Sequence, residues 1–284
     1  PDARRRRSPY PAPHPKPAAG PPLRPMSRHF LQLGALRLSY VDFGGPGRPL
    51  VALHGHFGCA RNFAPLAAAL APERRVIALD QRGHGWSGHP DSATREDYVA
   101  DALALLRHLD LGPVPVLGHS LGGCNAYQLA ARHPERVSAL VVEDIGARIG
   151  LGAKLGRSWP KRFPSCDAVL AHLAASGLDG DRHFLDSLAE FEDGWGFRFD
   201  PDWMDLSRHA IRGDWTADWV AVSCPTLLLH GTRSWAVTAP EIERMRRLRP
   251  DTDYAEFDCG HTMHDEMPDA FAAAVRSFLD RAGV

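Results

Sequence analysis

Short runs of apolar residues alternate with longer segments of helical periodicity along most of this chain. Several of the apolar runs are continuous, which is typical of parallel strands that are buried on both faces. The apolar runs cover residues 29–33, 36–44, 49–55, 74–83, 114–120, 137–146, 224–231 and 252–260. Helical spacing covers about residues 60–71, 94–110, 121–133, 239–249 and 268–282. This alternation predicts an α/β fold with a doubly wound, mostly parallel sheet.

Residues 147–220 interrupt that rhythm. The segment has no convincing strand pattern, and it is rich in arginine, aspartate, glycine and aromatic residues. We predict a helical cap over the carboxyl ends of the strands, where ligands of such folds bind. The core would then consist of residues 29–146 and 221–284, and Trp159 is a candidate pocket residue of the cap.

The first residues of the chain differ in composition from the rest. Residues 1–25 hold nine prolines and four consecutive arginines, with almost nothing that could enter a core. Such a composition cannot bury enough apolar surface to offset the entropy lost on ordering. We therefore predict that residues 1–28 form a disordered tail rich in proline and arginine.

Charge and cysteine usage narrow the class of protein. The net charge of −1 gives no global field that would attract nucleic acid or an acidic membrane, and no run approaches the roughly 20 apolar residues of a membrane span. We expect a small-molecule substrate and a monomer or homodimer. The five cysteines are scattered without a CxxC pair, which favours a reducing, cytoplasmic setting. No metal-ligand, Walker or dinucleotide motif is present, so neither a metal nor a cofactor is expected.

Ser120 stands where a predicted strand changes into a predicted helix, within the stretch Gly-His-Ser-Leu-Gly-Gly at residues 118–123. Gly118 and Gly122 remove the Cβ atoms that would clash across a sharp turn. The start of the helix also presents backbone N–H groups and a positive dipole end beside the serine. These features predict a nucleophile held on a strand-to-helix elbow.

Further signals stand at the positions that a serine nucleophile requires. The turn at residues 53–58 ends an early strand, and a backbone N–H there could form half of an oxyanion hole. His261 follows the last predicted strand and precedes the last helix, from where a general base can reach back to Ser120. A serine followed by a histidine near the C-terminus is the expected chain order for this architecture.

These motifs resemble those of the α/β-hydrolase superfamily over residues 29–284. The matching pieces are His-Gly at 54–55, DQRGHGWS at 80–87, GHSLGG at 118–123, PTLLLHG at 225–231 and GHTMHDEMP at 260–268. The resemblance implies that Ser120 is the nucleophile and His261 the base. It also implies an oxyanion hole made by the N–H of Leu121 with that of His56 or Phe57.

The sequence departs from the family at the usual position of the triad acid. Members of the family carry an aspartate in the turn after the penultimate strand, where this chain has Ser234. Some branches supply the acid one strand earlier, where Glu143 and Asp144 end a strand. Strand alternation sends these two side chains to opposite sides. We favour Asp144, with Glu143 as the alternative acid, and expect Trp235 to line the pocket.

The predicted activity is hydrolysis of a carboxylic ester or lactone of a partly apolar small molecule through an acyl-enzyme. Two alternatives remain. In the first, the same machinery cleaves a C–C bond, an amide or a proline peptide, or transfers an acyl group. Alternatively, the protein is a non-catalytic binder that lost the usual triad acid, as Ser234 suggests.

Overall fold

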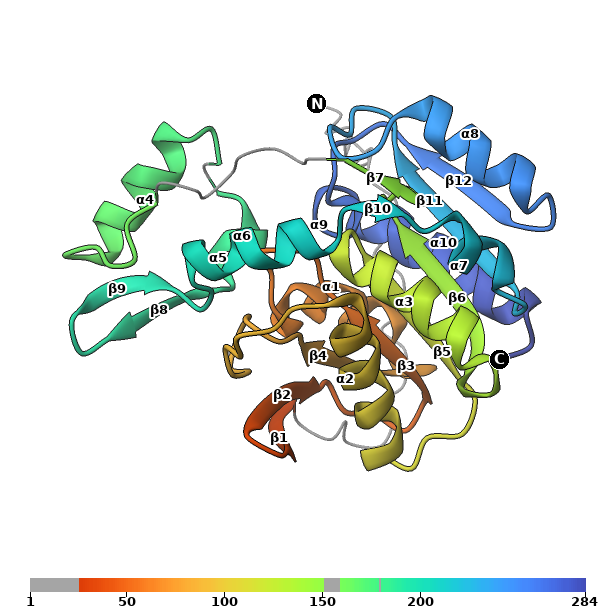
Figure 1. The fold of residues 1–284 in the computed structure, drawn as a ribbon, viewed down its shortest axis with the longest axis horizontal. Coiled ribbons are helices and arrows are strands. Elements are labelled where there is room, and N and C mark those ends of the chain that lie inside the picture. Colours follow the sequence, from red (N-terminus) through yellow and green to blue (C-terminus); the bar gives the residue numbers. More distant parts are fainter. Residues whose placement is uncertain (1–25, 151–158, 179) are drawn as a thin grey trace, which may run out of the picture.

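The computed structural model describes residues 26–150, 159–178 and 180–284. An eight-stranded sheet forms its centre (Figure 1). In spatial order the strands are β1 (Ser27–Leu33), β2 (Leu36–Asp42), β4 (Arg74–Asp80), β3 (Arg48–Leu53), β5 (Val114–His119), β6 (Val137–Glu143), β11 (Thr226–Gly231) and β12 (Asp253–Phe257). The β1–β2 and β2–β4 pairs are antiparallel, and all the later pairs are parallel.

Helices cover both faces of this sheet. One face packs against α2 (Arg95–His108), α3 (Leu121–Arg132), α7 (Thr216–Ala221) and α8 (Ala239–Leu248). The other packs against α1 (Ala64–Leu70), α9 (Met263–Glu266) and α10 (Pro268–Arg281). Short 3₁₀ turns cover Ala60–Phe63 and Pro134–Arg136. The predicted fold class, a doubly wound and mostly parallel sheet, is confirmed.

Strand β3 shows why continuous apolar runs build this sheet. Successive side chains of a strand point to opposite faces. Val51 and Leu53 enter the hydrophobic cluster beneath α2 and α3, whereas Leu50 and Ala52 enter the cluster beneath α1 and α10. All four side chains are at most 1% exposed. A strand that is buried on both faces therefore shows no alternation of apolar and polar residues along its sequence.

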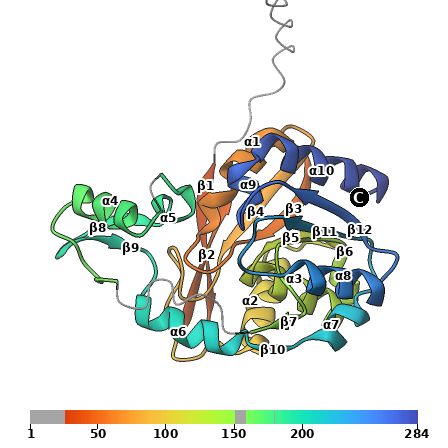
Figure 2. The same cartoon turned by 90° about the horizontal axis from the view of Figure 1, so that it is seen from above.

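A cap projects from the core beyond the carboxyl ends of the strands, and its outer part lies at the left of Figures 1 and 2. Its elements are β7 (Arg148–Ile149), α4 (Cys166–Ala175), α5 (Arg182–Leu185), β8 (Leu188–Phe191), β9 (Gly194–Phe197), α6 (Pro201–Ala210) and β10 (Gly213–Asp214). Phe57 of the core enters an apolar cluster with cap residues such as Phe184 and Phe199. Aromatic packing of this kind fixes the cap above the loop that follows β3.

The cap predicted for residues 147–220 contains helices, but it also contains strands, for which the sequence had shown no convincing pattern. Strands β8 and β9 form an antiparallel hairpin, and β7 pairs with β10 at the base of the cap. The hairpin turn places Gly194 at φ +130°, a conformation that side chains with a Cβ rarely adopt. The hairpin strands have only four residues each, and their burial does not alternate cleanly.

The boundaries of the core also differ slightly from the expectation. Strand β1 already begins at Ser27. Trp219 of α7 is fully buried in the cluster beneath α3, so this helix packs with the core although it was assigned to the cap. The predicted disordered tail lies almost wholly outside the described residues. Among the helices in the described ranges, none has both the length and the apolar character needed to cross a membrane.

Candidate active site

Ser120 lies on the sharp elbow that the sequence predicts. It caps α3 with φ 51° and ψ −116°, a strained combination for a residue with a Cβ. A Cβ on Gly118 would lie 2.1 Å from the Gly122 carbonyl oxygen, and one on Gly122 would lie 2.0 Å from that of Leu53. The two glycines are therefore required by the close approach of three chain segments. The Ser120 N–H donates to the Glu143 carbonyl at 2.9 Å, which holds the elbow against β6.

His261 contacts Asp144, the carboxylate that we favoured from the sequence. The His261 Nδ1–H donates to Asp144 Oδ2 at 2.6 Å. Because a carboxylate only accepts hydrogen bonds, this contact leaves the lone pair of His261 on Nε2. Asp144 directly follows β6 and has φ 53°, so it is a second strained residue at the site. A histidine held in this tautomer is suited to act as a general base.

Further donors surround the buried Asp144 carboxylate. Oδ1 accepts from the Gly231 N–H at 3.0 Å and from His230 Nδ1 at 3.2 Å. The Ser234 hydroxyl donates to Oδ2. Burial by itself would raise the pKa of Asp144, but the hydrogen bonds from His230, His261 and Ser234 outweigh it and lower the pKa below its usual value. Asp144 is therefore an anion, and the serine at the family's usual acid position helps to hold it.

Glu143, the alternative acid, points to the other side of β6. Its carboxylate accepts from the His264 N–H at 3.0 Å and from His264 Nδ1 at 2.8 Å. Burial disfavours a charged His264, but the attraction of Glu143 and its hydrogen bond outweigh burial and raise the pKa of His264 to about 9. Glu143 thus forms a buried pair with His264 and does not contact His261.

The predicted oxyanion-hole residues lie around the elbow. Neither the Phe57 N–H nor the Leu121 N–H donates to another group within the described ranges. Phe57 has φ 67°, and the preceding carbonyl, of His56, accepts from His183 Nε2 at 2.6 Å. Since C=O and N–H point in opposite directions across a trans peptide, this contact turns the Phe57 N–H away from His183. The His56 side chain lines the cavity described next, and its Nε2 lies 2.9 Å from Ser207 Oγ.

Ser120 and His261 both line a cavity of about 590 Å³ beneath the cap. Apolar side chains of its wall come from the core and from the cap: Phe57, Ile145, Leu178, Phe184, Ile211 and Val237. Trp235 also lines it, and its ring centroid lies 4.9 Å from that of His261. Trp159 does not line the cavity, contrary to our expectation. It packs behind Phe57 and Phe184, within the apolar cluster of the cap.

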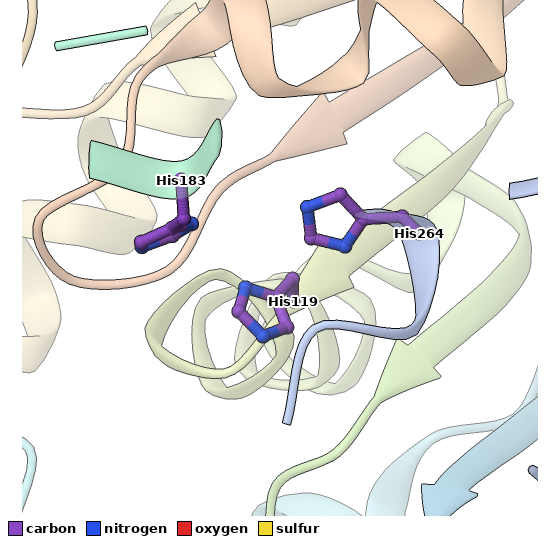
Figure 3. Close-up of side chains that lie close together, drawn as sticks. All are labelled: His119, His183 and His264. Atoms are coloured by element: carbon purple, nitrogen blue, oxygen red, sulfur yellow. The ribbon is translucent and has the colours of Figure 1, made fainter. Parts of the chain in front are cut away.

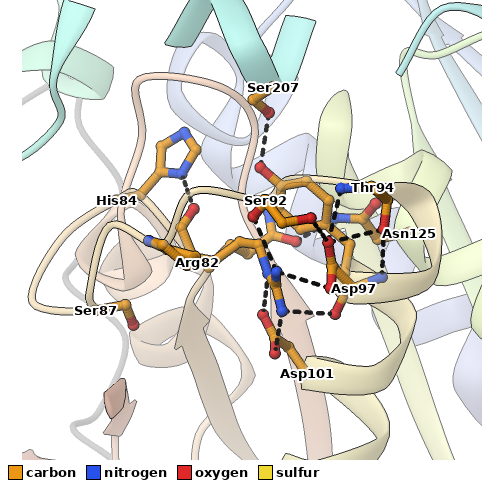
Figure 4. Close-up of polar contacts among 12 residues, drawn as sticks. Arg82, His84, Ser87, Ser92, Thr94, Asp97, Asp101, Asn125 and Ser207 are labelled. Atoms are coloured by element: carbon orange, nitrogen blue, oxygen red, sulfur yellow. Dashed lines mark hydrogen bonds and ion pairs between the residues drawn. The ribbon is translucent and has the colours of Figure 1, made fainter. Parts of the chain in front are cut away.

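The DQRGHGWS stretch forms scaffolding near the site (Figure 4). The Arg82 guanidinium donates to both oxygens of Asp101 on α2, at 2.7 and 2.8 Å. His84 Nδ1 donates to the Arg82 carbonyl at 2.9 Å. On α2, the Tyr98 hydroxyl lies 2.7 Å from Ser207 Oγ of the cap helix α6. These contacts brace the loop after β4 and tie the cap to the core.

Sequence reasoning missed a group of buried histidines behind the elbow. His119, His183 and His264 each offer one ring nitrogen within 4.8 Å of the other two. The three residues belong to β5, α5 and α9, and they are far apart along the chain. No local spacing motif could reveal them, because only the fold brings these segments together.

Comparisons with known proteins agree with this geometry. A family model of the alpha/beta hydrolase fold matches residues 48–167. The sn-1-specific diacylglycerol lipase ABHD11 of Mus musculus is 34% identical over 267 residues, which cover 87% of this chain and 86% of the lipase. The 2-(acetamidomethylene)succinate hydrolase of Mesorhizobium japonicum is 29% identical and covers 89% of this chain and 97% of its own length.

A solved structure is similar over nearly the whole chain. The crystal structure of E-2-(acetamidomethylene)succinate hydrolase matches with a TM-score of 0.83 and 26% identity, covering 90% of this chain and 99% of that one. Together with the sheet, the elbow and the curated relatives, this match defines the class of protein. The chain belongs to the α/β-hydrolase family, and it is a hydrolase.

Proposed function

We propose that this hydrolase cleaves a carboxylic ester or lactone of a partly apolar small molecule through an acyl-enzyme on Ser120. The observation that carries the proposal is the short contact between His261 Nδ1 and the Asp144 carboxylate, beside a serine on a strained elbow. Both Ser120 and His261 face the same 590 Å³ cavity. The arrangement has the parts that nucleophilic catalysis needs: nucleophile, base and a group that orients the base.

In the proposed reaction, the Ser120 hydroxyl attacks the substrate carbonyl while His261 Nε2 accepts its proton. Asp144 stabilises the imidazolium that forms. The N–H groups of Leu121 and Phe57, which have no other acceptor within the described ranges, would stabilise the developing oxyanion. His261 then donates the proton to the leaving oxygen, and water that it activates releases the acid.

The cavity wall supports a substrate with an apolar part. Phe57, Phe184 and Trp235 contribute aromatic surface, and Ile145 and Ile211 contribute aliphatic surface. Burial of such a substrate would contribute roughly 25 cal/mol per Å² of apolar surface. The chemistry described needs no cofactor. The five cysteines are all unpaired, which supports our proposal of a reducing, cytoplasmic setting.

A second candidate is hydrolysis of an amide. The relative with the TM-score of 0.83 is a hydrolase whose substrate name contains an acetamido group. The same serine, histidine and oxyanion donors would serve an amide, provided that His261 protonates the leaving nitrogen. A short series of p-nitrophenyl esters tested beside the matching p-nitroacetanilides distinguishes the two candidates by their kcat/KM values.

Labelling with a fluorophosphonate probe, followed by mass spectrometry of the digested protein, tests the proposed function. We expect one adduct, on Ser120, and loss of esterase activity in step with labelling. His261→Ala should suppress labelling, whereas the exposed His209→Ala serves as a matched control. Labelling of another residue, or esterase activity that survives complete labelling of Ser120, would contradict the proposal.

A further inference from the structure

The buried histidines behind the elbow form a cluster that the proposed reaction does not use. His119 ends β5, His183 lies on α5 of the cap, and His264 lies on α9. All three are at most 5% exposed. In Figure 3 the rings point toward one another, and one nitrogen from each lies within 4.8 Å of the others.

The outer nitrogen of each ring is already hydrogen-bonded. His119 Nε2 donates to the His261 carbonyl at 3.0 Å, and His183 Nε2 donates to the His56 carbonyl at 2.6 Å. His264 Nδ1 donates to the Glu143 carboxylate at 2.8 Å. These three partners only accept hydrogen bonds, so each outer nitrogen must carry the hydrogen. Contacts of this kind fix tautomer and ring orientation in histidines that bind metals.

The remaining nitrogens are His119 Nδ1, His183 Nδ1 and His264 Nε2. Each is buried and has no hydrogen-bond partner within the described ranges. In a neutral ring whose outer nitrogen carries the hydrogen, the inner nitrogen offers a lone pair. One bound cation could satisfy all three nitrogens, and its binding would release the hydrogen from His264 Nε2.

Carboxylates make the surroundings of the cluster negative. Glu143 lies directly behind His264. Asp265 Oδ2 lies 3.7 Å from His264 Nε2, and the Asp265 side chain is 9% exposed. Both Asp265 oxygens are buried and lack a hydrogen-bond partner within the described ranges. A buried carboxylate without a hydrogen bond is a costly group, and coordination of a cation would compensate it.

We propose that His119, His183 and His264 bind a structural Zn²⁺ ion, with Asp265 as the fourth ligand. Imidazole nitrogen suits zinc better than Mg²⁺ or Ca²⁺, which prefer oxygen. Zn–N bonds of about 2.0–2.1 Å in a tetrahedron set the nitrogens about 3.4 Å apart. The ligand nitrogens, which lie within 4.8 Å of one another, therefore need to approach by roughly 1 Å. Four protein ligands would close the site to substrate.

The proposed ion would join three parts of the molecule. His183 belongs to the cap, whereas His119 precedes the candidate nucleophile and His264 follows the candidate base by three residues. Zinc would thus fasten the cap to the core at the wall of the cavity, which His119 and His183 help to line. Since metal binding adds its free energy to the folded state, the ion should stabilise the protein and hold the cap closed against proteolysis.

The test uses full-length protein stripped with a chelator, dialysed and titrated with Zn²⁺ alone against a chromophoric competitor. We expect one tightly bound ion per chain. We also expect Tm to rise by about 5 °C or more at a free Zn²⁺ concentration about 100 times Kd. Asp265→Asn should weaken binding about 10-fold or more, in the range typical of altered metal sites.

His183→Gln removes one ligand on the cap side and should abolish both the stoichiometric binding and the Tm shift. The exposed His209→Gln on α6 is the matched control and should behave as the unaltered protein. If His183→Gln fails to fold, the Asp265→Asn comparison and the titration of the unaltered chain still decide the matter. No stoichiometric ion in the unaltered protein, or equal binding by His183→Gln, would overturn the proposal.

Discussion

Two histidine–carboxylate pairs lie on opposite sides of the end of β6, and they differ in what surrounds them. His261 lines the cavity with its side chain 11% exposed, and Asp144 is buried behind it. Glu143 and His264 are sealed, with side chains at most 1% exposed. Neighbouring positions at the end of one strand therefore supply a pair whose histidine a substrate can reach and a pair that it cannot reach. The difference indicates that accessibility of the histidine from the cavity, and not residue type, distinguishes a candidate catalytic pair from a structural pair.

Replacing the nucleophile should have the largest effect on activity. Ser120→Ala should lower kcat for a p-nitrophenyl ester by about 10⁵- to 10⁶-fold, as loss of a triad serine does. Circular dichroism and Tm should show an intact fold, and burst kinetics should disappear. Residual activity within ten-fold of the unaltered enzyme would show that another group performs the attack.

Breaking the sealed pair should affect stability far more than catalysis. Glu143→Gln removes one partner of a buried pair and should lower the free energy of unfolding by about 3–5 kcal/mol. Urea unfolding in the presence of a chelator measures this loss without bound metal. The exposed pair of His133 and Glu135, 3.8 Å apart, offers the control. Glu135→Gln should change stability by less than about 1 kcal/mol. A stable Glu143→Gln variant that has lost activity would reverse the roles of the two carboxylates.

The smallest effect is expected at the family's usual acid position. Ser234 supplies one of several hydrogen bonds to Asp144. Loss of one such bond is worth about 1 kcal/mol, so Ser234→Ala should lower kcat by less than about ten-fold. Steady-state kinetics on one ester suffices for the comparison. A loss as large as that expected for Ser120→Ala would mean that the serine itself takes part in the chemistry.

Much of the fold could be predicted because buried parallel strands leave continuous apolar runs, as in β3 and β5. The hairpin of the cap was missed although Asp193-Gly194 between aromatic residues is a recognised turn signal. The alternation of side chains along a strand predicted that Glu143 and Asp144 would point to opposite sides. It could not predict which of the two carboxylates contacts His261. That depends on the path of the loop after β12. The three-histidine cluster depends on the fold alone, because its members come from separate segments.

The central claim is that Asp144 orients His261 in place of the carboxylate that Ser234 replaces. Asp144→Asn should preserve the fold and lower kcat by about 10³- to 10⁴-fold, because the base then loses its orienting charge. Adding Ser234→Asp to this variant should restore part of the rate, since the Ser234 side chain contacts the same Asp144 oxygen as His261 does. The measurement is kcat for Asp144→Asn with and without Ser234→Asp, beside Glu143→Gln. We expect a large loss of kcat for Asp144→Asn, a partial recovery of kcat when Ser234→Asp is added, and little change of kcat for Glu143→Gln. Full activity of Asp144→Asn with an inactive, folded Glu143→Gln would contradict the central claim.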